Sequence, residues 1–183
     1  MEPAKIAVKS GETMRLLKIL LLALIAIIVL CGAALTVAGL IIPAERSFTN
    51  EVEINAPAET VWQVVTDRSK YTEWQTNLTR IEVIDDKNWI EYPKDSPEPL
   101  RFSLAKDEQP ERMEFNYTMG DSFGGKWHGE ISRTTNGVRL KTEDSYAAKG
   151  WLTKIMIAAF FDMDSFAKDW NQRLKQRAES LNR

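Results

Sequence analysis

The sequence has few of the residues that most often perform catalysis or bind metals. It contains one cysteine, Cys31, and one histidine, His128, in 183 residues. An internal disulfide or a cysteine–histidine pair is therefore not available to residues 43–183, which contain no cysteine. Structural zinc usually requires several clustered Cys or His ligands, so a lone histidine argues against a metal site.

Basic residues are also scarce in the C-terminal part of the chain. Residues 43–183 contain 20 Lys and Arg against 24 Asp and Glu, a net charge of −4. Nucleic-acid binding depends on basic side chains that neutralise phosphates, and no basic stripe is present. The glycine-rich segment 120–125 lies between two predicted strands with no helix after it, which argues against a phosphate-binding loop. We predict no nucleic-acid partner and no cofactor.

The most prominent feature that is present is an apolar run over residues 19–42, ILLLALIAIIVLCGAALTVAGLII. At about 1.5 Å per residue, a helix of this length crosses a hydrocarbon core of roughly 30 Å. The alternative is a cleaved signal peptide, but secretory apolar regions are usually about 7–15 residues long. The run therefore predicts an uncleaved transmembrane helix whose partner is the lipid bilayer.

Basic residues flank this run unevenly. Those that precede it are Lys5, Lys9, Arg15 and Lys18. Only Arg46 follows it closely. The positive-inside rule then predicts a short cytoplasmic tail over residues 1–18 and a C-terminal domain in the periplasm or outside the cell. Residues 43–47 form a short linker, so the domain over residues 48–183 is expected close to the bilayer.

The predicted domain begins with alternating polar and apolar residues over 48–54, FTNEVEI, which indicates a half-buried strand. Pro57 suits the first turn of a following helix, and a short second helix or turn is expected over residues 68–74. Six more short alternating segments follow. They are residues 80–84, 88–92, 100–105, 112–119, 126–134 and 138–146.

The end of the chain has a different pattern, because apolar residues recur at helical spacing from residue 150 onward. This spacing predicts one amphipathic helix of about 30 residues. An antiparallel sheet with one wet face buries such a helix most simply by curving around it. We therefore predict an α+β fold: a seven-stranded curved antiparallel sheet around a long C-terminal helix, preceded by one transmembrane helix.

Three segments of the domain resemble the START-like superfamily, also called SRPBCC, and look most like its polyketide cyclase/dehydrase branch. They are EINAPAETVWQVVTD, KYTEW and, near the C-terminus, GWLTKI with FFDMD. The resemblance covers residues 48–180 and implies the helix-grip fold with a cavity for lipids, sterols, polyketides or other apolar ligands. Many members bind or carry their ligands and a minority catalyse cyclisation or dehydration, so the fold alone does not assign an activity. The membrane anchor departs from the usual soluble member.

Large apolar residues on the predicted strands and C-terminal helix are the candidates for lining this cavity. They are Trp89, Phe102, Phe115, Tyr117, Trp127, Tyr146, Met156 and Phe160. An ordinary packed core is the competing interpretation of the same residues. Tyr117 and Tyr146 could also offer a hydroxyl group to a ligand, because such pockets are mostly apolar with a few placed polar groups.

No catalytic residue is assigned from the sequence, and Asp144 is the best candidate, ahead of Glu91. Asp144 lies an even number of residues after Val138 and Leu140, so strict alternation along the strand would point its side chain inward with theirs. A carboxyl group that faces an apolar cavity has a raised pKa and can act as an acid or a base. The alternative is a solvated carboxylate at the strand end. His128 alternates with the apolar Trp127 and is expected to face solvent.

Three functions remain open at this point. The first is a membrane-anchored START-like domain that binds a hydrophobic small molecule or lipid. The second is a cyclase- or dehydratase-like enzyme that acts on an apolar substrate, and it needs a buried ionisable group at the cavity. The third is a non-catalytic interaction module whose pocket is vestigial, and the sequence does not give its oligomeric state.

Overall fold

The structure is a computed structural model that describes residues 4–183, with side chains from residue 11 onward. The chain divides into two compact units, one ending at Ile42 and the other formed by Pro43–Arg183. The first three residues of the predicted cytoplasmic tail lie outside the described residues, as do the side chains of Lys5 and Lys9.

The first unit is a single helix, α1 (Ala4–Ile41). Within it, Gly11–Ile41 is long and apolar enough to cross a membrane. The helix begins well before the predicted span at residue 19 and therefore includes most of the predicted tail. Its apolar side chains are exposed along its length, as Leu30 at 69% and Leu40 at 70% illustrate.

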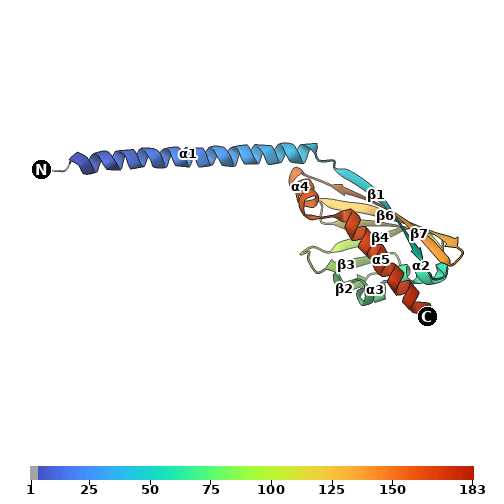
Figure 1. The fold of residues 1–183 in the computed structure, drawn as a ribbon. Coiled ribbons are helices and arrows are strands. Elements are labelled where there is room, and N and C mark those ends of the chain that lie inside the picture. The colour runs from blue at the N-terminus through green and yellow to red at the C-terminus, as the bar shows by residue number, and fades with distance from the viewer. Residues whose placement is uncertain (1–3) are drawn as a thin grey trace. The chain divides into compact units, whose positions relative to one another are not determined.

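The second unit contains one antiparallel sheet of seven strands, as predicted (Figure 1). Its order is β1-β7-β6-β5-β4-β3-β2, so the first and last strands of the sequence are neighbours. The strands are β1 (Glu45–Ile54), β2 (Leu78–Val83), β3 (Asn88–Pro93), β4 (Leu100–Glu108), β5 (Arg112–Met119), β6 (Phe123–Thr134) and β7 (Gly137–Ala148). The helices are α2 (Ala58–Thr66), the 3₁₀ turn η1 (Arg68–Lys70), α3 (Tyr71–Trp74), α4 (Trp151–Phe160) and α5 (Met163–Leu181).

Two strands begin three residues earlier than the sequence pattern indicates. β1 starts at Glu45 rather than at Phe48, because Glu45–Ser47 pair with Ser145–Ala147 of β7. Most of the predicted linker is therefore part of the sheet. β6 starts at Phe123, inside the glycine-rich segment, because Phe123 pairs with both Met119 and Ala148.

The prediction of a single C-terminal helix is wrong in one respect, because the structure has two helices there, α4 and α5. The break lies at Phe161 and Asp162. Asp162 caps α5: its carboxylate accepts hydrogen bonds from the Ser165 backbone N–H (3.0 Å) and from the Ser165 hydroxyl (2.8 Å). Such a cap satisfies backbone donors at the start of α5, and the extended backbone of Phe161 ends α4 just before it.

The helix α5 packs along the concave face of the sheet, which curves around it in Figure 1. Leu174 and Ala178 are fully buried, at 0% exposure. A buried hydrogen bond also joins the two layers, because the Asn171 side-chain amide donates to the Thr142 hydroxyl at 2.9 Å. This bond satisfies polar groups that would otherwise be costly to bury.

The same helix also covers backbone groups near the end of the outer strand β1. The Lys175 ammonium donates to the Glu53 carbonyl at 2.6 Å. The Glu179 carboxylate accepts from the Asn55 backbone N–H at 2.9 Å. Helix α5 thus occupies polar groups that an outer strand would otherwise leave unpaired.

Replacing Leu174 by Ala is expected to lower the free energy of unfolding by about 2–5 kcal/mol, because the substitution leaves a cavity in the core. The measurement is urea unfolding of the full chain in detergent micelles, followed by tryptophan fluorescence. Leu181→Ala is the matched control in the same helix, because Leu181 is 52% exposed. Its effect should stay within about 0.5 kcal/mol. Equal effects of the two substitutions would contradict this packing.

Candidate ligand site

The centre of the interior is filled by aromatic rings. Trp89 stacks on Phe102 and meets Phe115 edge-on, both with ring centroids 5.0 Å apart. Phe115 stacks on Trp127 at 4.9 Å, and Trp127 contacts Trp170 of α5 at 5.5 Å. Four of the predicted cavity residues therefore contact one another in this part of the core.

Open space remains at one end of the sheet, where α4 gives way to α5. A pocket of about 500 Å³ lies there, lined by residues 46–48 of β1, Tyr146 of β7 and residues 158–164. Its walls combine aromatic rings and methyl groups with the charged side chains of Arg46, Asp162 and Asp164. Of the predicted cavity residues, Tyr146 and Phe160 line it. This volume lies within the usual range of small-molecule sites, about 300–1,000 Å³.

Asp144 lies next to this pocket, on the face of β7 that also carries the buried Thr142 and Tyr146. It is paired with Phe48 of β1 on one side and Trp127 of β6 on the other. One carboxylate oxygen, Oδ2, is buried and has no hydrogen-bond partner among the described residues. Burial, and secondarily the negative charge of Asp164, raise the pKa of Asp144 to about 7.

The neighbouring Asp164 has the opposite electrostatic environment. It accepts a hydrogen bond from the Asn50 side-chain amide at 3.2 Å and forms an ion pair with Lys168. The Lys168 hydrogen bond is the main cause that lowers the pKa of Asp164. The site therefore holds one carboxyl group that takes up a proton near neutral pH beside one that stays ionised, an arrangement that can separate acid and base roles.

Aromatic rings continue from the central core to this pocket. Tyr117 contacts Phe123 at 6.0 Å, Phe123 contacts Tyr146 at 5.8 Å, and Tyr146 contacts Phe48 at 6.5 Å. The Tyr117 hydroxyl donates to the Ser145 carbonyl at 3.5 Å, and burial, followed by the charge of Asp144, raises its pKa.

Sequence reasoning missed the other nine residues that line the pocket, among them Phe48, Phe161 and Asp164. Phe48 was visible as an inward residue of the first strand, but its approach to Tyr146 depends on the pairing of β1 with β7.

A second polar cluster surrounds Glu91 on the other side of the core. The Trp89 indole N–H donates to Glu91 at 3.0 Å, and the Arg68 guanidinium lies 4.0 Å from the centroid of the Trp89 ring. Burial raises the pKa of Glu91 to about 7, although this hydrogen bond and the Arg68 charge oppose the shift. A pocket of about 470 Å³ adjoins Arg68, but it is lined by Glu59, Asp86 and Asp107 as well. Only Trp62 and Leu104 give it large apolar side chains, whereas four aromatic rings line the pocket beside Asp144, which therefore suits an apolar ligand better.

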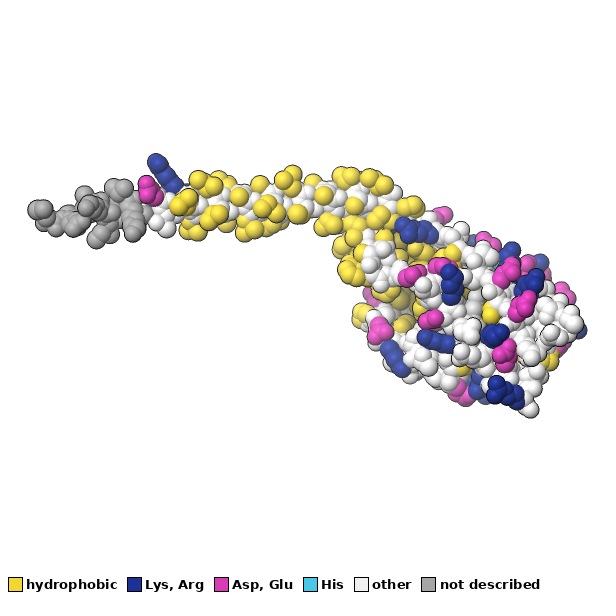
Figure 2. All heavy atoms as spheres, in the orientation of Figure 1, with side chains coloured by type: hydrophobic (Ala, Val, Ile, Leu, Met, Phe, Trp, Pro, Cys, Tyr) yellow, Lys and Arg dark blue, Asp and Glu magenta, His cyan; other side chains and the backbone are white. Residues whose placement is uncertain are grey.

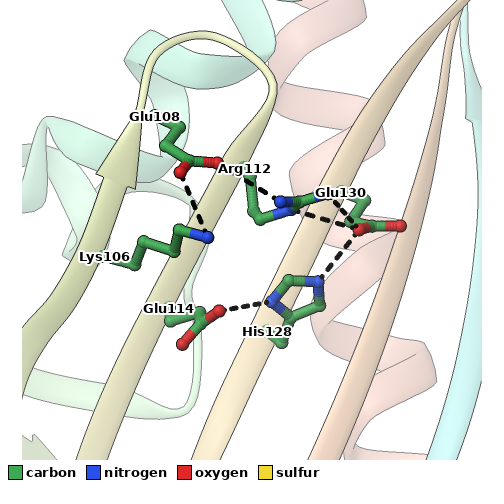
Figure 3. A network of polar contacts seen from close by, with 6 residues as sticks. All are labelled: Lys106, Glu108, Arg112, Glu114, His128 and Glu130. Carbon is green, nitrogen blue, oxygen red and sulfur yellow. Dashed lines mark hydrogen bonds and ion pairs between the residues drawn. The ribbon is translucent and has the colours of Figure 1, made fainter.

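His128 belongs to an ion-pair network on the outer face of the sheet (Figure 3). Its Nδ1 lies 3.2 Å from Glu114 and its Nε2 lies 3.4 Å from Glu130. The other members are Lys106, Glu108 and Arg112. None of the six residues lines either pocket. Among the described residues, no group of three or more His, Cys, Asp or Glu side chains could hold a metal ion.

The remaining predicted cavity residue, Met156, lies on α4 with 45% of its surface exposed. It is not among the residues that line the pocket.

Solved structures with the same fold support this view of the architecture. A START superfamily protein from Mycobacterium smegmatis has 15% identity and a TM-score of 0.58, covering 75% of this chain and 98% of its own. A norcoclaurine synthase from Thalictrum flavum has 12% identity and a TM-score of 0.60, covering 76% and 97%. The di-domain aromatase/cyclase StfQ of steffimycin biosynthesis has 11% identity and a TM-score of 0.59, covering 75% and 51%. These likenesses show the fold alone.

At the sequence level, the family described as "Polyketide cyclase / dehydrase and lipid transport" matches residues 54–171. Comparison with curated proteins gives no match.

The raised pKa of Asp144 makes the stability of the domain depend on pH. The folded domain keeps the Asp144 proton up to about pH 7, whereas the free side chain releases it near 3.8. Because the folded domain binds this proton more tightly than the unfolded chain does, protonation of Asp144 stabilises the fold. This stabilisation is fully present below pH 3.8 and is lost as the pH rises through about 7. The raised pKa of Glu91 has the same effect, because the stabilisation from its proton is lost between pH 4.5 and about pH 7.

Asp144→Asn is therefore expected to flatten the fall in stability between pH 4 and pH 8. At pH 8 the variant should unfold at a temperature about 2–8 °C higher than the wild type, with a smaller difference at pH 4. The measurement is thermal unfolding of the full chain at both values. Asp121→Asn, at an exposed loop position, is the control and should behave as the wild type does. A variant that keeps the full pH dependence would contradict the environment assigned to Asp144.

Proposed function

Because the chain belongs to the polyketide cyclase/dehydrase and lipid transport family, we propose that its domain binds an apolar small molecule or lipid in the pocket beside Asp144. The observation that carries the proposal is the pocket of about 500 Å³ between β1, β7 and the junction of α4 with α5. The stacked residues Trp89, Phe115 and Trp127 belong to the packed core rather than to the lining of this pocket, which Tyr146 and Phe160 form in part.

The pocket also favours a particular ligand chemistry. Its methyl groups and rings suit an apolar body, whereas Asp144 and Asp164 lie where a polar end would rest. The buried, unpaired oxygen of Asp144 favours a hydroxyl or amine group at this polar end, because either group can donate a hydrogen bond to it. Asp144 can accept a hydrogen bond when ionised and donate one when protonated.

Helix α1 would hold this domain at a membrane. We propose that α1 is an uncleaved signal anchor with its N-terminus in the cytoplasm, supported by its length, its composition and the basic residues that precede the apolar run. The domain would then lie in the periplasm or outside the cell. Only residues 42–44 separate α1 from β1, so the tether raises the effective concentration of membrane-derived ligands near the pocket.

Photocrosslinking tests the binding site. The full chain in nanodiscs is illuminated with a diazirine-bearing fatty alcohol, and labelled peptides are mapped by mass spectrometry. Crosslinks are expected in residues 46–48 and 158–164. Ala159→Trp fills the pocket and should reduce this labelling several-fold, relative to the labelling of α1 in the same sample.

The control for that experiment is Ala105→Trp on the exposed face of β4, which should leave the labelling unchanged. Absence of pocket crosslinks in the wild type, with α1 labelled, would refute ligand binding at this site and favour the interaction-module alternative.

A second candidate function is catalysis of a cyclisation or dehydration on an apolar substrate. The buried, unpaired oxygen of Asp144 favours it, because a carboxyl group with a pKa of about 7 can transfer protons at neutral pH. Mass spectrometry of the molecules that co-purify with the wild type and with Asp144→Asn tests it. A dehydratase predicts that the variant retains a precursor heavier by one water, whereas a binding protein predicts the same molecule in both.

A further inference from the structure

The surface of α4 is unusually apolar for an exposed helix. None of its ten residues is buried, although apolar residues dominate it. We call its large exposed side chains, together with Phe161 and with Phe166 of α5, the α4 apolar surface. They are Trp151, Leu152, Met156, Phe160, Phe161 and Phe166. Their exposed fractions reach 72% at Phe160 and 59% at Phe161, and Figure 2 shows hydrophobic atoms gathered over α4 beside a mixed-charge face.

These residues cluster where they can act together. Leu152, Met156 and Phe160 recur every four positions, so they form one stripe along the helix. Exposed apolar residues that occur singly are normal, but a contiguous cluster of this kind marks a binding surface.

The α4 segment itself carries charges of one sign, whereas Asp162 and Asp164 flank the end of the surface at Phe161 and Phe166. Lys149 and Lys154 are the charged residues between Asp144 and Asp162, and residues 145–161 contain no carboxylate. Trp151 stands at the first position of the helix, next to these lysines. An apolar face with an aromatic edge and basic neighbours is the composition that binds the interface of an anionic bilayer.

The topology places α4 at the end of the sheet where the chain enters the domain. Glu45, the first residue of β1, is paired with Ala147, and the Ala148 backbone N–H donates to the Ala44 carbonyl at 2.8 Å. Only Lys149 and Gly150 then separate β7 from α4. The start of α4 and the residue to which the α1 tether is attached are therefore neighbours within the domain.

We propose that the α4 apolar surface inserts into the interface of the same bilayer that α1 spans, as a second membrane contact of the domain. This inference rests on the proposed anchoring by α1. Such insertion would bring the pocket to the bilayer surface, because residues 158–161 lie at the end of α4 and also line the pocket. A ligand would then pass between bilayer and pocket without crossing bulk water.

Spin labels on single cysteines test the proposal in the full chain, reconstituted in vesicles that contain anionic lipid. The native Cys31 carries the label in one sample and reports on α1. In the other samples Cys31→Ser is combined with Leu152→Cys, Phe160→Cys or the control Asn136→Cys, whose exposed turn joins β6 and β7 at the opposite end of the sheet. Accessibility of each label to oxygen and to a water-soluble nickel reagent gives its depth.

Labels at residues 152 and 160 are expected about 5–10 Å below the headgroup boundary, with the label at 136 in water. A lipid-embedded label at Cys31 together with labels at 152 and 160 as water-accessible as the control would overturn this inference and leave the anchoring intact. A water-accessible label at Cys31 would overturn both. Labels at 152 and 160 that are shielded from both reagents and show spin–spin broadening would assign the surface to a second copy of the chain, which also overturns the proposal.

Discussion

The packing of aromatic rings across the concave face of the sheet is the constraint on which the rest of the domain depends. The contacts run from Trp89 through Phe115 and Trp127 to Trp170, so strands β3, β5 and β6 and helix α5 share one continuous cluster. Buried aromatic side chains contribute more apolar area than any others, and α5 has few other large residues to bury. The cluster fixes where α5 lies and fills the centre of the space that the sheet encloses. The pocket of about 500 Å³ lies outside this cluster, where α4 ends and α5 starts.

The features of the domain that suit ligand binding or proton transfer lie together at that end. The pocket, the unpaired oxygen of Asp144, the ionised Asp164 and the α4 apolar surface all lie around the junction of α4 with α5. The link between them is the pairing of β1 with β7, which brings residues about 100 positions apart together. The other ionisable groups of note, the Glu91 cluster and the His128 network, lie elsewhere in the domain. Function is therefore best sought at one end of the sheet.

Most of the fold could be predicted because alternation along each strand is a local signal. Residues 112–119 were assigned with their observed bounds, and the inward parity of Asp144 followed from the same alternation. The break between α4 and α5 could not be predicted, because Asp162 looks like any surface charge until its bonds to Ser165 are seen. The pocket was also beyond reach, since Phe48 and Asp164 meet Tyr146 and Asp144 only through long-range pairing and helix placement.

The contacts between α5 and the end of β1 have a consequence for many copies of the chain rather than for one. An outer strand offers free backbone donors and acceptors to the sheet of any neighbour, which is a common start of aggregation. Proteins anchored in a bilayer diffuse in two dimensions with their domains at similar height, so such encounters are frequent. Lys175 and Glu179 already occupy backbone groups of Glu53 and Asn55. Under the proposed anchoring by α1, these contacts of the C-terminal helix would keep neighbouring copies in one membrane plane from pairing their sheets through this end of β1.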